Sequence, residues 1–494
     1  MNVLAEPYDP LPSSSPDGYW TSSGKNPNTF DGQGRKRAFV TAWWWFNATQ
    51  EVSLKHKLTF FLHTSFTVGK DSGAGFSSNF FDHLRLLEHY ALGNIKTLAK
   101  KVTVDNSMLN YLDNTSNNAN NPNENYAREF LELFTILKGP QIGEGDYTNY
   151  TETDVQQAAK VLSGFKRQFN RTIIDKDTNL PTGYGNKNRH DPSDKTFSHA
   201  FDHTVIKGRN TVSEMFEELD DFVEMVFAKE ETAKSYCRKL YRFFVKSEWG
   251  EDVENDIIAP LAIILKEANY EIIPVIKALL TSSHFFDADD DNAENEIIGS
   301  IVKSPIQQFT EVLSLFNVTY PDPNTDPLRF YRNFYLYFVH NAYLNGAGMP
   351  FFNPDSVAGY PAHYQEPDFD RIWFSSNTLI ARYKMIESLI FGTNTISGGR
   401  NYAELDTVKF VEENIEKPDN TEALITEISE LLYPESIDEH RRDHFIKILL
   451  DGFNSGYWME AWNQYLSSGD KTSVKTRLDP LIIAMINAAE FQLM

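Results

Sequence analysis

One stretch of the sequence places charged side chains at helical spacing. Glu124, Arg128 and Glu132 follow one another at four-residue intervals, so a helix would present them on one face. Asn125 and Glu129 form a second pair of the same kind. Such a face is typical of an exposed ladder of ion pairs. It equally fits a carboxylate–arginine cluster that lines a cleft, with Glu129 or Glu132 as a base or metal ligand.

A second stretch concentrates histidine and aspartate. His190 and Asp191 precede His199 and His203, and the last two are four residues apart. Two histidines at this spacing hold a divalent metal best on a helix, where both rings share a face, but the surrounding residues alternate as in an extended segment. The segment therefore predicts either a metal site built from these four residues or ordinary polar packing.

An acidic run offers a candidate calcium site. Asp287, Asp289 and Asp291 match the first, third and fifth positions of an EF-hand loop. The sixth position is Asn292 rather than Gly, and the twelfth is Ile298 rather than Glu, so the EF-hand pattern fails. A looser Ca²⁺ site and a solvated acidic loop are the remaining interpretations. A divalent metal or Ca²⁺ is thus the cofactor the sequence allows for, and the sequence contains no nucleophile elbow, P-loop or dinucleotide pattern.

Aromatic residues offer a binding surface of another kind. Residues 346–370 form a long loop rich in Gly, Pro and aromatic side chains, and such loops are usually functional or disordered. The candidate binding residues in and just after this loop are Phe351, Phe352, Asn353, Tyr360 and Trp373. Tyr360 and Trp373, together with the three tryptophans at 43–45, could stack on sugar rings.

The elements that must position these residues are mostly helices, because apolar residues recur at three- and four-residue spacing from about Phe39 onward. Between 166 and 207, β-branched and aromatic residues alternate with turn formers. We therefore expect a mainly α fold, a large multi-helix body with a small β-hairpin or loop insertion around 166–207. A Pro-, Ser- and Gly-rich segment, 1–36, precedes what we expect to be a single helical domain, 37–494.

The composition of the chain argues against several classes of function. The chain has 46 basic and 69 acidic residues and a net charge of −23, which argues against a nucleic-acid partner, since phosphate binding needs a basic surface. The single cysteine, Cys237, excludes an internal disulfide. No apolar run is long enough to span a bilayer, and residues 1–36 lack the pattern of a signal peptide.

Several motifs occur in a characteristic order. They are PNENYAREFLELFTILKG (122–139), YTETDVQQAAKVLSGF (150–165), RHDPSDKTFS (189–198), CRKLYRFFV (237–245), MPFFNPDSVAGYP (349–361) and AAEFQLM (488–494). With these motifs the chain resembles the bacterial family Domain of Unknown Function 1800, from about Trp43 to the end. The resemblance marks as motif positions Asn123, Glu124, Asn125, Arg128, Glu129, Glu132, Asp154, His190, Asp191 and Lys195.

Two departures from the family pattern concern candidate site residues. In FFLHTSF, 60–66, His63 is kept but Ser65 stands where the family has a second His. The later Trp-Pro pair of the family is Tyr360-Pro361 in this chain. If either family residue serves as a ligand or a stacking platform, this chain has altered it.

The resemblance implies little chemistry, because the family has no established activity. Its members are often exported, which implies an extracytoplasmic location (periplasmic, cell-surface or secreted), although a cytoplasmic location stays open. Their genes often lie beside those of Domain of Unknown Function 1501, a family similar to sulfatases and phosphatases, so the resemblance implies such a protein as a partner.

Three functions follow as hypotheses. The first is an extracytoplasmic helical scaffold or interaction protein in a cell-surface or secreted complex. The alternative is a hydrolase of glycan or ester substrates that uses Glu129, Arg128 and His63, or a metal held by His190 and Asp191. The third is a carbohydrate-binding protein with an aromatic platform.

Overall fold

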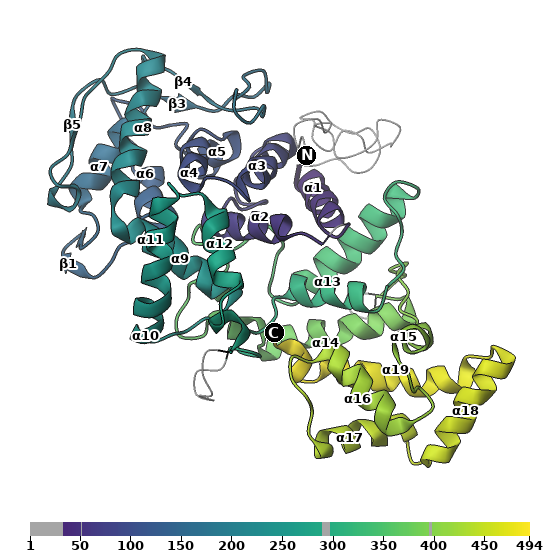
Figure 1. Ribbon diagram of the computed structural model, residues 1–494. Coiled ribbons are helices and arrows are strands. Elements are labelled where there is room, and N and C mark those ends of the chain that lie inside the picture. The colour runs from purple at the N-terminus through teal and green to yellow at the C-terminus, as the bar shows by residue number, and fades with distance from the viewer. Residues whose placement is uncertain (1–32, 51, 289–296, 395–397) are drawn as a thin grey trace. The chain divides into compact units, whose positions relative to one another are not determined.

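The computed structural model describes residues 33–50, 52–288, 297–394 and 398–494 (Figure 1). These residues form two compact units. Unit 1 comprises the described residues as far as Phe285 together with Phe352–Tyr364, and unit 2 comprises those in Phe286–Phe351 and Gln365–Met494. The single domain expected over 37–494 stays a prediction, and each unit is described by itself. None of the helices in the described chain has the length and apolarity that a membrane span requires.

Unit 1 is helical, as the periodicity predicts, and its first helix begins inside the segment 1–36. Its α-helices are α1 (Gln33–Ala48), α2 (Leu54–Ser65), α3 (Ser77–Tyr90), α4 (Ile95–Thr103), α5 (Asn106–Tyr111), α6 (Asn125–Glu129), α7 (Glu152–Val161), α8 (Val212–Ala228), α9 (Glu230–Phe244), α10 (Glu251–Val253), α11 (Ala259–Glu267) and α12 (Ile272–Leu280). Two π-helical turns, Phe130–Phe134 and Glu254–Ile258, continue α6 and α10, and short 3₁₀ turns lie at His199–Phe201, His284–Phe286 and Pro361–His363.

Helix α3 lies at the centre of unit 1, in contact with α1, α2, α4 and α5 (Figure 1). Of its 14 residues only His89 is not buried. Arg85 pairs with Glu88 of the same helix, and the other buried charged and imidazole groups of α3 pair with side chains from other elements. His83 Nδ1 lies 3.0 Å from Asp105 Oδ2, and Arg171 donates two hydrogen bonds, of 2.7 and 2.8 Å, to Asp82. A helix this polar can be buried only because these partners meet it.

Small β elements supplement the helices, which confirms the mainly α fold with a small β insertion. Three antiparallel pairs occur among the described residues, β1 (Gln141–Gly143) with β2 (Asp146–Tyr147), β3 (Phe165–Lys166) with β4 (Tyr184–Gly185), and β5 (Lys195–Thr196) with β6 (Val205–Ile206). The last two pairs frame the predicted insertion around 166–207. The first pair was not expected from the sequence.

A buried ionic cluster fastens the insertion to α8. Lys195 and Glu218 are fully buried and paired with each other, and the Lys195 ammonium also donates a 2.6 Å hydrogen bond to the Asp191 carbonyl. His190 Nε2 lies 3.1 Å from the second Glu218 oxygen, and Nδ1 lies 2.9 Å from the Ser163 carbonyl. Every polar atom that these side chains bring into the core thus meets a partner, which is what a buried ion pair requires.

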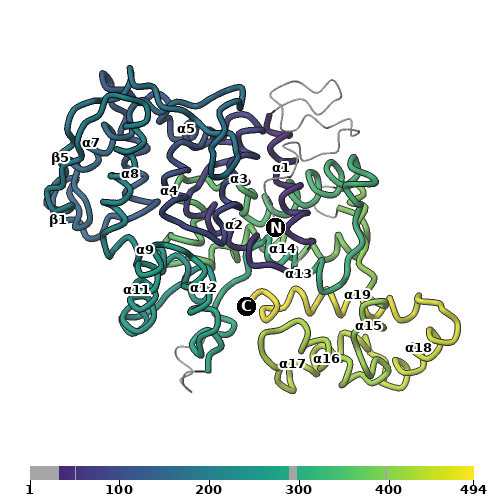
Figure 2. The backbone as a smooth tube through the Cα atoms, turned by 45° about the horizontal axis from the view of Figure 1, so that its top comes forward, coloured from purple at the N-terminus to yellow at the C-terminus, as the bar shows by residue number. Residues whose placement is uncertain are grey.

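Unit 2 is built around its last long helix, α19 (Thr472–Asn487), which contacts α14 to α18 (Figure 2). The unit also contains a 16-residue π-helix, Arg329–Leu344, and 3₁₀ turns at Phe369–Trp373 and Glu490–Gln492. Its other helices are α13 (Pro305–Leu315), α14 (Ser376–Phe391), α15 (Thr407–Asn414), α16 (Thr421–Leu432), α17 (Glu439–Leu450) and α18 (Ser455–Ser468).

The cluster around Glu218 yields a stability prediction. Lys195→Met removes one partner of a fully buried pair and should lower the free energy of unfolding by about 3–5 kcal/mol. Chemical denaturation of the purified variant measures the loss. Lys207→Met is the matched control, because Lys207 pairs with Asp194 at the surface and its removal should change little. A Lys195→Met loss no larger than that of the control would contradict a structural role for the cluster.

Candidate functional site

The motif between Asn123 and Glu132 folds as α6 followed by a π-helical turn. Its two asparagines hold the neighbouring loop. Asn123 donates to Ser116 Oγ at 3.1 Å, and Asn125 donates to the Leu112 carbonyl at 3.1 Å. Both side chains therefore form hydrogen bonds that stabilise the fold.

Arg128 also has a partner, Glu152, which the helical spacing of the motif did not predict. Its guanidinium donates two hydrogen bonds to the Glu152 carboxylate, at 2.9 and 2.6 Å, and one to Glu124 at 3.2 Å. The hydrogen bonds to Glu152 raise the pKa of Arg128, and the same bonds lower the pKa of Glu152. All three side chains are about one-third exposed, so they form the partly exposed ion-pair cluster that the spacing allowed.

Glu132 faces a different pair of partners. Tyr150 donates its hydroxyl to Glu132 at 3.0 Å, and the Lys138 ammonium lies 2.5 Å from the other carboxylate oxygen. Because a π turn begins directly after Glu129, Glu132 projects in a different direction from the one that an unbroken α-helix would give it. A cation and a hydroxyl donor therefore hold Glu132 in place.

Glu129 differs from its neighbours because it has no hydrogen-bond or ion-pair partner among the described residues. Burial and the negative charge of Glu132 raise its pKa to about 7, against the opposing effects of Arg128 and Lys138. Tyr111 lies close enough that the charge of Glu129 adds to the effect of burial in raising the pKa of the phenol. A carboxyl group with this pKa exchanges protons readily at neutral pH.

His63 lies in the core rather than beside Glu129. Its side chain is fully buried, Nε2 lies 3.1 Å from the Val68 carbonyl, and the ring meets that of Phe352 edge to face at 4.7 Å. Burial and the nearby His83 ring lower its pKa to about 3, so the imidazole is neutral at physiological pH. No interaction in the described part of the chain connects His63 with Glu129 or Arg128, and its catalytic role stays a prediction.

The aromatic loop packs inward. Phe351, Phe352, Tyr360 and Trp373 are each at most 2% exposed. Only Asn353 is partly exposed, and its Oδ1 accepts a 2.6 Å hydrogen bond from the Asp71 amide. Trp44 and Trp45 are buried as well. The residues expected to form a sugar-stacking platform are thus mainly core residues, and the geometry does not favour the carbohydrate-binding hypothesis.

The predicted metal ligands are not brought together. Within the described ranges, no three His, Cys, Asp or Glu side chains are placed to hold a metal ion. Both ring nitrogens of His190 already have partners in the core, whereas His199 and His203 are exposed. Asp191 accepts hydrogen bonds from Ser193.

Two further acidic candidates, Asp154 and Asp287, accept hydrogen bonds from backbone amides. Asp154 is the N3 residue of the capping box that begins α7, and it also accepts a 2.7 Å hydrogen bond from the Ser198 amide, so it ties the insertion to this helix. Asp287 accepts a 2.9 Å hydrogen bond from the Ile297 amide, while Asp289 and Asp291 lie outside the described residues.

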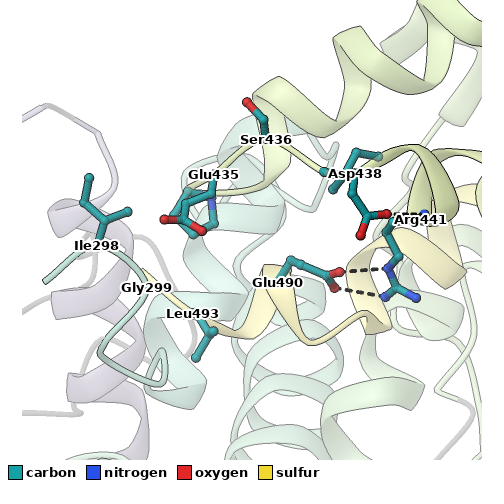
Figure 3. Close-up of a pocket in the computed structure, with 10 residues that line it drawn as sticks. Ile298, Gly299, Glu435, Ser436, Asp438, Arg441, Glu490 and Leu493 are labelled. Atoms are coloured by element: carbon teal, nitrogen blue, oxygen red, sulfur yellow. Dashed lines mark hydrogen bonds and ion pairs between the residues drawn. The ribbon is translucent and has the colours of Figure 1, made fainter. Parts of the chain in front are cut away.

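A cavity of about 400 Å³ opens in unit 2, between the loop that precedes α17 and the C-terminal residues (Figure 3). Figure 3 shows the Arg441 guanidinium paired with both oxygens of Glu490, at 2.7 and 2.9 Å. The cation that lines this cavity is therefore already neutralised, and we assign no reaction to it.

Comparisons with known proteins give a family but no function. A family model described as "Protein of unknown function (DUF1800)" matches residues 14–493. Neither a curated protein nor a solved structure matches the chain.

The raised pKa of Glu129 predicts a pH-dependent stability. A carboxyl group whose folded pKa is about 7, above its ordinary 4.5, contributes fully to stability below pH 4.5, and this contribution is lost as the pH rises through 7. Gln stays neutral, so Glu129→Gln should gain about 1–3 kcal/mol in unfolding free energy relative to the wild type between those values. Denaturant titrations at several pH values measure the gain. Glu144→Gln, at an exposed position between β1 and β2, should show none, and a flat difference for Glu129→Gln would contradict the raised pKa.

Proposed function

The chain belongs to the DUF1800 family, which is described as a protein of unknown function, and we propose that it is a hydrolase in which Glu129 transfers a proton. The observation that carries the proposal is the isolation of Glu129. Every other charged side chain between Glu124 and Glu132 is bound to a partner, whereas Glu129 has none among the described residues and has a pKa of about 7.

The cation beside Glu129 does not prevent this role. Arg128 lies next to Glu129 in the chain and would lower its pKa strongly if it were unpaired. Its guanidinium is instead bound by Glu152 and Glu124, which offset most of its positive charge. Burial and Glu132 therefore outweigh Arg128, and the Glu129 carboxyl can donate a proton as an acid or accept one as a base near pH 7.

The substrate class follows from this kind of proton transfer. When a glycosidic or ester bond is hydrolysed, the oxygen of water bonds to the anomeric or acyl carbon, and the bond from that carbon to the leaving oxygen breaks. A partly protonated carboxylic acid can donate its proton to that leaving oxygen. Glu132, held by Lys138 and Tyr150, would remain as a fixed negative charge three residues away. We propose glycans or esters as the substrates on this chemistry.

Substitution of Glu129 tests the proposal. The purified chain is screened against chromogenic glycosides and esters, and kcat/KM for any substrate found is measured from pH 5 to pH 9. We expect an inflection near pH 7 and a loss of roughly 100-fold or more in Glu129→Gln. Glu144→Gln controls for the loss of a surface carboxylate. Wild-type activity in Glu129→Gln would overturn the assignment.

A second candidate function, an interaction protein acting outside the cytoplasm, is favoured by a different observation. The insertion presents apolar side chains to solvent, with Phe169 60% exposed and Ile173, Ile174 and Tyr184 each 38–39% exposed. These residues lie on one excursion of the chain, since Ile174 pairs with Pro181 and Tyr184 pairs with Lys166. Exposed apolar side chains gathered in this way commonly mark a protein-binding surface.

The partner we propose is a protein of the sulfatase- and phosphatase-like Domain of Unknown Function 1501. The chain and such a protein from the same organism should co-elute in size-exclusion chromatography. Phe169→Ser should abolish the co-elution, whereas Phe391→Ser, at a similarly exposed aromatic position on α14, should not. Separate elution of the two wild-type proteins would contradict the partnership.

A further inference from the structure

The N-terminus of α3 is a helix end without the usual acidic or side-chain cap. Its N-cap is Phe76, whose side chain cannot accept a hydrogen bond, and no acidic residue lies in the first turn. Gln33 accepts a 2.7 Å hydrogen bond from the Ser77 amide, but the Ser78 and Asn79 amides have no acceptor among the described residues. The end of a 14-residue helix therefore presents free N–H groups and its partial positive charge.

The loop before α3 is fixed so that its carbonyl groups point into the protein. Asn110 donates to the Gly73 carbonyl at 2.5 Å, Ser107 to the Ala74 carbonyl at 2.7 Å, and Arg37 to the Gly75 carbonyl at 2.7 Å. Gly73 and Gly75 have φ angles of 147° and 79°, which residues other than glycine rarely adopt. Two different helices, α5 and α1, thus hold this backbone in one conformation.

Three cations surround this loop with only one acidic partner. Arg37 and Lys70 both pair with Asp71, whose side chain is 43% exposed, while Arg167 donates to Asn110 and has no carboxylate partner. Burial lowers the pKa of all three cations. A chain with a net charge of −23 has nevertheless gathered surplus positive charge at this position. A bound anion would offset the cost of burying that charge.

Buried donors at the same helix end have no partner. Ser77 Oγ and Asn79 Nδ2, on side chains at most 3% exposed, make no hydrogen bond among the described residues, and neither does Arg37 Nε. The side-chain carboxamide of Asn79, which carries this Nδ2, lies beside the loop and Arg167, since a Cβ built on Gly75 would lie 3.6 Å from Asn79 Oδ1 and 3.7 Å from Arg167 Nη1. Three unpartnered donors at one helix end, beside cations that outnumber their acidic partners, favour a ligand that accepts these hydrogen bonds.

We propose that the N-terminus of α3, with Arg37, Arg167, Ser77 and Asn79, binds a tetrahedral oxyanion, either free phosphate or sulfate or the same group carried by a larger ligand. Helix α1 supplies Arg37 and the insertion supplies Arg167, so the anion would join segments far apart in the sequence. α1 and α5 pack against α3, and β3 packs against α5 (Figure 1). The site uses neither Glu129 nor its partners and does not depend on the proposed hydrolase.

Asn79→Asp tests the site with an isosteric change. An aspartate at the third helical position supplies the missing negative charge, which stabilises an uncapped helix N-terminus and repels an anion from the same place. Sodium sulfate and sodium phosphate are titrated into the full chain by isothermal titration calorimetry, with chloride keeping the ionic strength constant. We expect saturable binding to the wild type, at least about tenfold weaker binding to Asn79→Asp and Arg167→Gln, and a melting temperature of Asn79→Asp without anion at or above that of the wild type.

Lys207→Gln is the control, since it removes an exposed cation elsewhere on the insertion and should bind like the wild type. A sugar phosphate that binds more tightly than inorganic phosphate assigns the site to an esterified ligand, and equal affinity assigns it to the free anion. The proposal is overturned if the wild type shows no saturable binding of either anion, or if Asn79→Asp binds both as well as the wild type does.

Discussion

Burial of helix α3 is the constraint on which unit 1 depends. The helix is almost entirely enclosed, yet it carries Asp82, His83, Arg85 and Glu88 into the core. Each of these groups needs a partner, because an unpaired charge in the interior costs more than a typical domain can spare. Arg85 pairs with Glu88 inside the helix, and Asp105 at the start of α5, Arg171 in the insertion and Lys55 in α2 supply the partners from outside it. The polar side of α3 thereby selects which elements pack around it.

The same constraint separates structural side chains from those available for chemistry. Glu218 forms an ion pair with Lys195, and Arg128 forms one with Glu152. Asp154 accepts a hydrogen bond from the backbone at the start of its own helix. Once these pairs are set aside, a smaller set of polar groups in unit 1 lacks a hydrogen-bond partner among the described residues. The half-buried carboxyl group of Glu129 belongs to this set, and so do the buried donors at the N-terminus of α3. Functional candidates are therefore best found by asking which buried polar groups lack partners, rather than which charged residues gather in the sequence.

Local patterns could be predicted from the sequence, whereas pairings between distant segments could not. Helical periodicity gives most helices, and alternation gives the insertion, because both depend on neighbouring residues. Glu152 and Glu218 were missed as partners since they lie 24 and 28 residues from Arg128 and His190. Glu218 did leave a signal, because it occupies the apolar stripe of α8 with Met215 and Phe222, where a charge requires a buried partner. In sequence, a segment rich in buried aromatic residues such as Tyr360 looks the same as a binding loop. The composition does not show whether an aromatic side chain points into the core or toward solvent.

Net charge hides the contrast between the two candidate sites. A chain at −23 is expected to repel anions, and at long range it does. A buried site responds instead to the charges within a few ångströms, because the interior screens less than water and salt weakens the contribution of distant surface groups. Near Glu129, burial and the charge of Glu132 outweigh the neighbouring cations and raise the pKa of the carboxyl group to about 7. At α3, the surplus of cations over carboxylates favours the anion that we propose there. One acidic protein can therefore combine a carboxyl group that exchanges protons near pH 7 with the separate anion site that we propose.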